Sequence, residues 1–346
     1  MLHVGVIGAT GYAGSALVSL LAVHPAVEIT YLASHSYSGK RFSDIYPAMR
    51  GICDLVLQEE DVPVASQVCS VLFLALPHGL ASYKVTEEIL ERTIIIDLGA
   101  DYRLSDSAVY TAWYKTEHGS PQLLPRAVYG LCELHRSQIE HANLIANPGC
   151  YTTCSILTLA PLVAEGLVDP SSLIIDSASG VSGAGRSEKL GSLYCEVNES
   201  YKAYSVASHR HTPEIEQELS RLAGFPLLVQ FTPHLAAMNR GILSTCYANL
   251  KDGVGEEEIA TAYQSWYGSQ RFIRLSGSNL PETRFVRNTN LCDIGWKVDD
   301  RTKRVVAIGA IDNLIKGAAG QAVQNMNIRC NLGEETGLPL SVANPL

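Results

Sequence analysis

The chain opens with a short apolar strand that runs directly into a glycine turn and a helix. Val4-Gly5-Val6-Ile7 precedes Gly8-Ala9-Thr10-Gly11-Tyr12-Ala13-Gly14, and residues 15–21 continue as a mostly apolar helix. Such a turn lets the backbone approach a pyrophosphate, which then lies at the N-terminus of the helix. The spacing departs from the usual Gly-x-Gly-x-x-Gly, and similar turns also serve simple packing of a helix on a strand. Because this turn follows the first strand at once, it predicts a Rossmann-type dinucleotide site formed by Gly8, Thr10, Gly11, Tyr12, Ala13 and Gly14.

The second strand, residues 27–33, indicates which dinucleotide is bound. It ends in Ser34-His35-Ser36-Tyr37-Ser38-Gly39-Lys40-Arg41, where no Asp or Glu stands to bind a ribose 2′-hydroxyl. Hydroxyl and basic groups suit a 2′-phosphate, so we expect NADP rather than NAD, although an ordinary polar loop would have the same composition. The cofactor-binding residues expected here are Ser34, His35, Ser36 and, after the next strand, Pro77.

Strands and helices alternate up to residue 149, and then the pattern changes. The runs 71–76 and 94–98 are continuously apolar, as in a parallel sheet covered on both faces. Ligands gather beyond the carboxyl ends of such strands, so the glycine turn, Ser34, Pro77, Arg103 and Cys150 are expected at one edge. Later strands are more amphipathic and lie at 173–179, 227–232, 242–250, 272–275, 294–298 and 304–311, with a helix at 256–267.

These patterns predict an α/β domain followed by an α+β domain. The first is a Rossmann-type NADP-binding domain over residues 1–149. A final helix at 313–326 and the tail are expected to return to it, so that residues 312–346 belong to it as well. Residues 150–311 form the catalytic and oligomerisation domain, built on a mostly antiparallel sheet. Ile311-Asp312-Asn313 resembles the end of a strand at a cofactor site, and Asn313 is taken as a cofactor ligand.

A thiol stands where a short strand gives way to a helix. Residues 143–146 form the strand, Pro148-Gly149 the turn, and the helix follows from Cys150. Unpaired N–H groups in the first turn of a helix stabilise a thiolate and hold an oxyanion at the carbonyl that it attacks. Cys150 is therefore the candidate nucleophile; the alternative is a buried small apolar residue, as free cysteines commonly are. Cys154 would share its helix face as a packing residue rather than as a redox partner.

A glycine-rich loop follows the strand at 173–179. Close approach of its backbone to a nicotinamide or a substrate is expected, which makes Ser179 and Gly180 cofactor-binding candidates and Arg186 a substrate-binding candidate. A plain flexible turn is the alternative.

The segment His209-Arg210-His211-Thr212-Pro213-Glu214 supplies two imidazoles. Thr212 is expected to cap a helix whose first residue is Pro213, which leaves both histidines in an exposed loop before it. We interpret them as acid/base partners of the thiol, with a solvated loop as the alternative. A metal site that also used Glu214 would lack a third ligand placed by the sequence, so no metal is expected.

Composition excludes several classes of protein. The 346 residues are 47% hydrophobic, and a formal charge of −9 disfavours a nucleic-acid partner. Residues 142–164 are uncharged, but Asn147-Pro148-Gly149 interrupts them, so no membrane span is expected. The first strand starts almost at Met1, which is not the pattern of a signal peptide. Nine dispersed cysteines without Cys-x-x-Cys spacing indicate reduced thiols in the cytoplasm.

Six segments together resemble one family. They are the glycine turn at 8–14, Ala75-Leu76-Pro77-His78-Gly79, Asp97-Leu98-Gly99-Ala100-Asp101-Tyr102-Arg103, Asn147-Pro148-Gly149-Cys150-Tyr151, His209-Arg210-His211-Thr212-Pro213-Glu214 and Ala322-Val323-Gln324-Asn325-Met326-Asn327. Over nearly its full length the chain resembles the N-acetyl-gamma-glutamyl-phosphate reductases, NADP-dependent enzymes of arginine biosynthesis. At position 132 it has Cys132 in place of the family's usual proline, a change expected to affect a turn and not the chemistry.

The resemblance implies residue roles and a reaction. Cys150 forms a thioester, and His211 is the acid/base with His209 beside it. Arg103 and Asn147 are candidates for substrate binding. The implied reaction converts N-acetyl-gamma-glutamyl phosphate and NADPH to N-acetylglutamate 5-semialdehyde and inorganic phosphate, in a cytoplasmic homo-oligomer, dimer or tetramer.

Two alternatives remain open at the level of sequence. The first is a reductase of another acyl phosphate, aspartyl or carrier-bound aminoadipyl. The second is a non-catalytic dinucleotide-binding redox sensor, which would keep the glycine turn but would need neither the thiol at a helix start nor the histidine pair.

Overall fold

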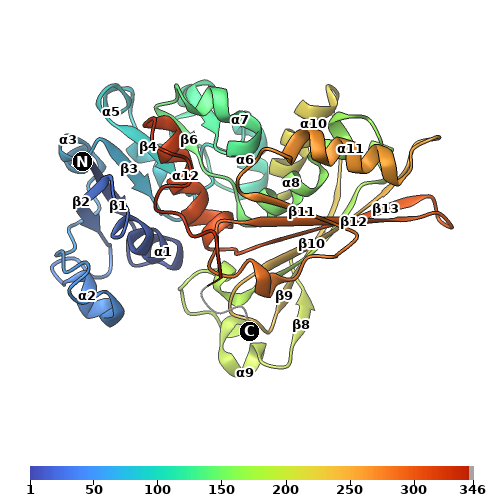
Figure 1. Ribbon diagram of the computed structural model, residues 1–346. Helices are drawn as coiled ribbons and strands as arrows, with labels where there is room; N and C mark the ends of the chain where they lie inside the picture. The colour runs from blue at the N-terminus through green and yellow to red at the C-terminus, as the bar shows by residue number, and fades with distance from the viewer. Residues whose placement is uncertain (343–346) are drawn as a thin grey trace. The chain divides into compact units, whose positions relative to one another are not determined.

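The computed structural model describes residues 1–342, which group into two compact units (Figure 1). Unit 1 comprises residues 1–148 and 318–338, and unit 2 comprises residues 149–317 and the chain from Pro339 onward. Residues 312–317 and 339–342 thus group with unit 2, whereas residues 312–346 were predicted to belong to the nucleotide domain.

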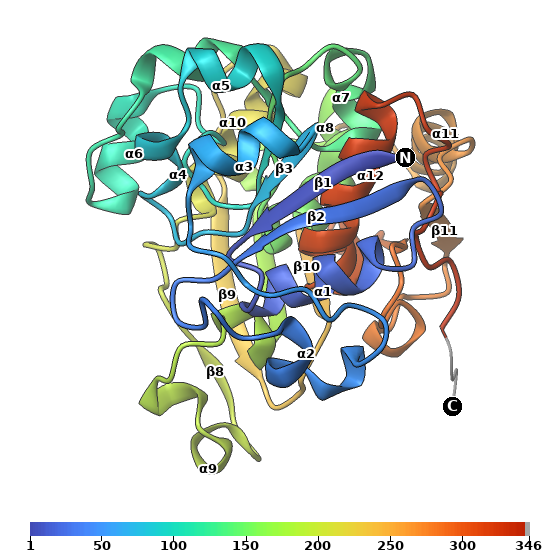
Figure 2. The same cartoon turned by 90° about the vertical axis from the view of Figure 1, so that its left-hand side faces the viewer.

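Unit 1 is built on a six-stranded sheet with the order β2-β1-β3-β4-β6-β5. All of its strand pairs are parallel, and Figure 2 shows β1 beside β2. The strands are β1 (Leu2–Ile7), β2 (Val27–Ala33), β3 (Val71–Leu74), β4 (Ile94–Asp97), β5 (Ala127–Tyr129) and β6 (Leu144–Ala146). The helices are α1 (Tyr12–Leu21), α2 (Phe42–Ile45), α3 (Val62–Val68), α4 (Ala81–Lys84), α5 (Glu87–Arg92), α6 (Ser107–Tyr114), α7 (Cys132–Ile139) and α12 (Gly320–Arg329).

The strand order of unit 1 reverses at β1, with β2 on one side and β3 on the other. Strands β3 and β4 are apolar along most of their length because both sheet faces are covered, and Leu72, Leu74 and Ile95 lie in one core cluster with Ile89 of α5. Since the strands are parallel, their carboxyl ends share one edge. In doubly wound sheets this edge binds ligands where the order reverses.

Unit 2 is built on a seven-stranded sheet with the order β11-β12-β13-β10-β7-β9-β8. Four of its strand pairs are antiparallel, and β11–β12 and β7–β9 are parallel. The strands are β7 (Ile174–Gly180), β8 (Tyr201–Ala203), β9 (Gln230–Ala236), β10 (Ile242–Asn249), β11 (Ile273–Gly277), β12 (Cys292–Asp299) and β13 (Arg304–Ile311). The helices are α8 (Cys150–Ala164), α9 (Tyr194–Val197), α10 (Thr212–Ala223) and α11 (Glu256–Tyr267). The expected fold class, Rossmann-type followed by a mostly antiparallel α+β domain, is confirmed.

Helix α8 forms the core of unit 2. It packs against β10 and β13, and Figure 1 shows α8, α10 and α11 over the same face of the sheet. Every residue from Tyr151 to Val163 is buried, which explains why this stretch carries no charge, because an unpaired charge is costly to bury. In residues 1–342 no helix is long and apolar enough to cross a membrane.

The last helix begins later than residue 313. Asp312 Oδ1 accepts the backbone N–H groups of Leu314 at 2.8 Å and Ile315 at 3.0 Å. A single π turn follows at Ile315–Ala319, and α12 starts at Gly320. Asp312 thus caps a helical turn of the π type, and the prediction of an α-helix from Asn313 was wrong in its start, because this turn precedes the regular helix.

Candidate active site

Glycine is required at two positions of the turn between β1 and α1. Gly8 has a φ of +78°, and a Cβ there would lie 2.4 Å from the Ala75 carbonyl oxygen. A Cβ on Gly14 would lie 2.3 Å from the Gly8 oxygen, so α1 packs directly on the turn. At Gly11 a Cβ would come no nearer than 3.6 Å to its neighbours, and no side chain in the described residues caps α1. The N–H groups of its first turn therefore have no side-chain cap, as at a helix start that binds a pyrophosphate.

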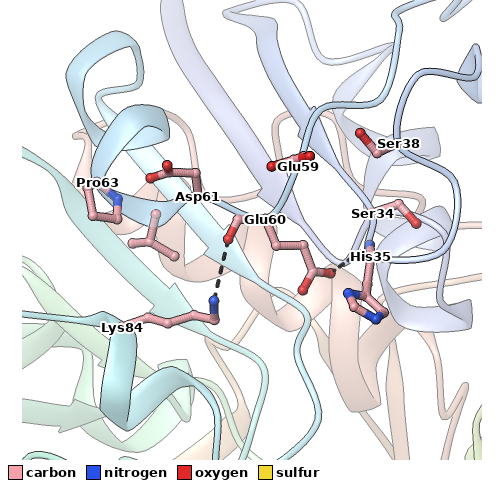
Figure 3. Close-up of a pocket in the computed structure, with 9 residues that line it drawn as sticks. Ser34, His35, Ser38, Glu59, Glu60, Asp61, Pro63 and Lys84 are labelled. Atoms are coloured by element: carbon pink, nitrogen blue, oxygen red, sulfur yellow. Dashed lines mark hydrogen bonds between the residues drawn. The ribbon is translucent and has the colours of Figure 1, made fainter.

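A cavity of about 610 Å³ lies at the carboxyl end of β2 (Figure 3). A bond of 2.7 Å between Thr10 Oγ1 and Ser34 Oγ joins it to the glycine turn. Its lining includes the expected Ser34 and His35, and also Ser38, Glu59, Glu60, Asp61 and Lys84. The volume is within the range of small-molecule sites.

The carboxylates of this cavity were not predicted from the sequence. Glu60 Oε1 accepts the backbone N–H of His35 at 3.2 Å, and Figure 3 shows its side chain directed at that residue. Glu60 arrives there because Gln58 forms a parallel bridge with Ala33 at the end of β2. No local pattern in the sequence pairs these segments. An acidic group thus stands at the end of β2 after all, supplied by a later part of the chain.

Two substrate-binding candidates are built into unit 1. Arg103 is 9% exposed; its Nε donates to the Asn147 carbonyl at 2.8 Å and its Nη2 to the Leu98 carbonyl at 2.8 Å. The Asn147 side chain donates to the Ala318 carbonyl at 3.1 Å and accepts from Asn325 at 3.2 Å. These bonds hold the connections that follow β4 and β6. Substrate binding by either residue stays a prediction.

Two aspartates follow the apolar part of β4: Asp97 is its last residue, and Asp101 lies four residues further on. Pro77, after β3, is exposed. Asp101 accepts the N–H groups of Gly79 at 2.6 Å and Ser82 at 2.9 Å, which fixes the segment after β3. Asp97 is fully buried, and burial, with a smaller contribution from the nearby Asp101, raises its pKa to about 7. Its Oδ1 accepts the Gly99 N–H at 2.9 Å.

Cys150 is the first residue of α8, directly after Gly149 at the N-cap position. Its side chain is partly exposed. Gly317 packs against it, and a Cβ at 317 would lie 2.8 Å from the Cys150 Cβ. Cys154, one turn further on, is fully buried, and burial raises its pKa to about 12. Of these two thiols, Cys150 is the accessible one at a helix N-terminus.

Both histidines of the 209–214 segment pack on Tyr151, the residue after the thiol. Ring centroids lie 5.6 Å apart for Tyr151 and His209, 5.9 Å for Tyr151 and His211, and 4.8 Å for the two histidines. Burial, and to a lesser degree Arg210, lowers the pKa of His209 to about 4, so this imidazole is neutral at pH 7. Its Nδ1 accepts the His211 N–H at 3.1 Å, which places its proton on Nε2.

The start of α10 differs from the expected one by one residue. The helix begins at Thr212, and His211 rather than Thr212 occupies the N-cap position. The carbonyl of His211 already accepts a helical bond from Ile215 at 3.0 Å. Both histidines are partly buried, so the expectation of an exposed loop was also wrong. The turn 209–212, closed by a bond from the Thr212 N–H to the His209 carbonyl, accounts for this.

The glycine-rich loop after β7 is fixed within unit 2. A Cβ on Gly180 would lie 2.7 Å from the Arg240 nitrogen, so the loop needs glycine there. Asn313 accepts the Gly241 N–H at 2.8 Å and donates to the Ser182 hydroxyl at 2.9 Å. These two bonds fix the loop in place. Arg186 is exposed. Among residues 1–342 no cluster of three metal-ligating side chains occurs.

Two family models match the chain, and they define its class. "Semialdehyde dehydrogenase, NAD binding domain" matches residues 3–142, and "Semialdehyde dehydrogenase, dimerisation domain" matches residues 150–313. Aspartate semialdehyde dehydrogenase II of Vibrio cholerae has a similar structure (TM-score 0.73, 16% identity, 96% of this chain and 99% of that one). So does aspartate semialdehyde dehydrogenase with NADP from Candida albicans (TM-score 0.66, 17% identity, 95% and 98%). The two models together cover most of the chain, which therefore belongs to the semialdehyde dehydrogenase class.

Full-length relatives narrow this class. N-acetyl-gamma-glutamyl-phosphate reductase of Syntrophobacter fumaroxidans is 52% identical over 338 residues, which cover 98% of each chain. The proteins of that name from Pelotomaculum thermopropionicum and Lachnospira eligens are 53% and 50% identical and cover 97% and 100% of each chain. The chain belongs to the N-acetyl-gamma-glutamyl-phosphate reductase family, which confirms the resemblance drawn from the sequence.

Proposed function

We propose that this protein reduces N-acetyl-gamma-glutamyl phosphate with NADPH to N-acetylglutamate 5-semialdehyde and inorganic phosphate, as a step of arginine biosynthesis. The observation that carries the proposal is Cys150 at the start of α8, with two histidines packed on the adjacent Tyr151. Relatives about half identical to this chain along its whole length bear the name of that activity.

The residues of unit 1 fit NADP. The pyrophosphate would lie on the turn from Gly8 to Gly14, against the uncapped start of α1. Ser34, His35 and Ser36 would face the 2′-phosphate end, beside the cavity that also contains Lys84. When bound, the nicotinamide supplies a hydride to the acyl carbon. Pro77, Ser179, Gly180 and Asn313 are the further cofactor candidates.

Cys150 opens the reaction as nucleophile. Its thiolate attacks the carbonyl carbon of the acyl phosphate, and N–H groups of the first turn of α8 hold the oxyanion. The carbon–oxygen bond to phosphate breaks, inorganic phosphate leaves with the bonding electrons, and a thioester to Cys150 remains. Sulfur suits both halves of this step because a thiolate forms near neutral pH and later departs readily.

His211 acts as the general acid and then the general base after hydride addition. It donates to the alkoxide of the thiohemiacetal and takes the proton back as the carbon–sulfur bond breaks, which releases the aldehyde and restores the thiolate. His209 stays neutral at pH 7, since burial lowers its pKa to about 4, and its Nε2–H is suited to hydrogen bonding the substrate. Arg103, Asn147 and Arg186 are the proposed groups for the rest of the substrate.

The protein is further proposed to be a cytoplasmic homo-oligomer, a dimer or a tetramer. The match of residues 150–313 to a dimerisation domain supports association through unit 2.

The reverse reaction tests the function directly. Purified protein is given NADP⁺, inorganic phosphate and one aldehyde at a time: N-acetylglutamate 5-semialdehyde, aspartate 4-semialdehyde or aminoadipate semialdehyde. We expect phosphate-dependent NADPH formation, with kcat/KM for the acetylated substrate about 100-fold above the others. Equal rates with aspartate 4-semialdehyde would overturn the substrate assignment, and NADPH formation without phosphate would overturn the acyl-phosphate chemistry.

A further inference from the structure

One carboxylate joins the start of α10 to the start of α8. Glu214 lies in the first turn of α10, three residues after His211. Its Oε1 accepts the Gly149 N–H at 2.9 Å and the Thr152 hydroxyl at 2.8 Å, and the residue is 1% exposed. Gly149 is the N-cap of α8 and immediately precedes Cys150. A single buried side chain therefore connects the helix that carries the imidazole to the helix that carries the thiol.

Most of the titratable groups around Cys150 and His209 are uncharged at pH 7, and the cation among them is Arg210, which acts on both His209 and Tyr204. Burial raises the pKa of Tyr204 and that of Cys154 to about 12 each, and it also raises the pKa of Tyr151. Burial lowers the pKa of His209 to about 4. A carboxylate bonded to the start of α8 opposes ionisation of Cys150, whereas the N-terminus of α8 and the cation Arg210 favour it. The fraction of Cys150 present as thiolate then depends on the balance between the negative carboxylate and these positive groups.

We propose that Glu214 is a positioning residue. It fixes Cys150 and His211 relative to each other, and it restrains ionisation of the thiol, so that the sulfur keeps its nucleophilicity. Nucleophilicity falls as a thiol becomes more acidic, so a helix N-terminus without this counter-charge would give a more abundant but weaker thiolate. The effect on turnover rests on the proposed reductase function, while the effect on the thiol requires no substrate.

Two substitutions separate the hydrogen bonds of Glu214 from its charge. Glu214→Gln keeps an oxygen acceptor for both donors and removes the charge, and Glu214→Ala removes both. The matched control is Glu216→Gln on the same helix, whose carboxylate accepts the Val229 N–H at 3.1 Å instead. Each full-length protein is alkylated with iodoacetamide across pH 5 to 9, with labelling of Cys150 followed by mass spectrometry, and kcat and KM are measured with substrate.

We expect the alkylation midpoint of both Glu214 variants to move to lower pH by about half a unit or more. We expect kcat to fall roughly tenfold or more in Glu214→Ala and less in Glu214→Gln, with KM within about threefold. Glu216→Gln should match the wild type in both measurements. The shift of the midpoint is a result that a purely structural role would not produce.

An unchanged midpoint in Glu214→Gln, or a move to higher pH, overturns the proposal. So does a folded Glu214→Ala protein with wild-type kcat. Should the alanine variant not fold, the glutamine variant decides. If the wild type shows no reductase activity, the proposed function fails, whereas the alkylation profiles still decide the role of Glu214.

Discussion

Asp97→Asn should change how the stability of the protein depends on pH. The carboxyl group is fully buried, and burial raises its pKa from an ordinary 3.8 to about 7. Because the folded chain binds this proton more tightly than the unfolded chain, the stabilisation is fully present below pH 3.8. It is lost as the pH rises toward 7. A difference of about three pKa units at about 1.4 kcal/mol each corresponds to about 4 kcal/mol over the whole range.

Most of this loss should occur in an accessible window. Between pH 5 and pH 8 the wild type should lose roughly 3 kcal/mol relative to Asp97→Asn, at about 1.4 kcal/mol per pH unit up to pH 7. Asparagine still accepts the Gly99 N–H that Asp97 Oδ1 accepts at 2.9 Å. It replaces an oxygen, Oδ2, that has no hydrogen-bond partner in residues 1–342.

Urea unfolding at pH 5, 6, 7 and 8 measures the difference between the two proteins. Asp54→Asn is the control, because hydrogen bonds from Ser43 and Gly51 lower the pKa of Asp54 and its titration lies below this window. Its difference from the wild type should stay flat. A flat difference for Asp97→Asn as well, or one of opposite slope, would refute the assignment of a buried, proton-binding Asp97.

Three other sites give sharp expectations for kinetics. Gly317→Ala should lower kcat at least about tenfold without changing cofactor affinity, because the added Cβ would lie 2.8 Å from that of the nucleophile; wild-type turnover would contradict the packing. The value of kcat/KM should be more than about tenfold higher with NADPH than with NADH, which corresponds to ~1.4 kcal/mol. Ser34→Asp should narrow this ratio because its charge repels the 2′-phosphate, and Glu60→Gln should widen it because it removes such a charge. Equal kcat/KM values for the two cofactors would contradict the assignment of the segment after β2 as the binding site of the 2′-phosphate. His211→Asn should cut kcat about a hundredfold while His209→Asn acts mainly on KM, and reversed phenotypes would exchange the two roles.

Local patterns in the sequence predicted most of the fold. The strand, glycine turn and helix at the N-terminus, the helix at 256–267 and the apolar runs that became β3 and β4 carry their own signals in turn residues and periodicity. The thiol at the start of α8 was predicted in the same way, since Pro148-Gly149 marks the turn. Short edge strands such as β8, which is exposed along its length, have no apolar pattern and were missed.

Groups that reach the site through tertiary contacts could not be predicted from the sequence. Glu60 lies at the end of β2 because of a bridge between Ala33 and Gln58, and nothing in either segment marks that pairing. Glu214 was recognised as a possible ligand near the histidines, but its bonds to Gly149 and Thr152 depend on how α10 packs against α8. The cap that Asp312 gives to the π turn before α12 likewise depends on where its carboxylate points.

Trapping the acyl-enzyme tests the central claim most directly. Wild-type protein is mixed with NADP⁺ and N-acetylglutamate 5-semialdehyde in the absence of phosphate, so that the thioester forms and cannot be released to phosphate. The account predicts a burst of NADPH close to one per active site and an acyl adduct on the peptide that contains Cys150. Cys154→Ser should behave as the wild type, and Cys150→Ser should show neither burst nor adduct because a serine hydroxyl stays protonated near pH 7. A Cys150→Ser protein that turns over within about threefold of the wild type would contradict the account.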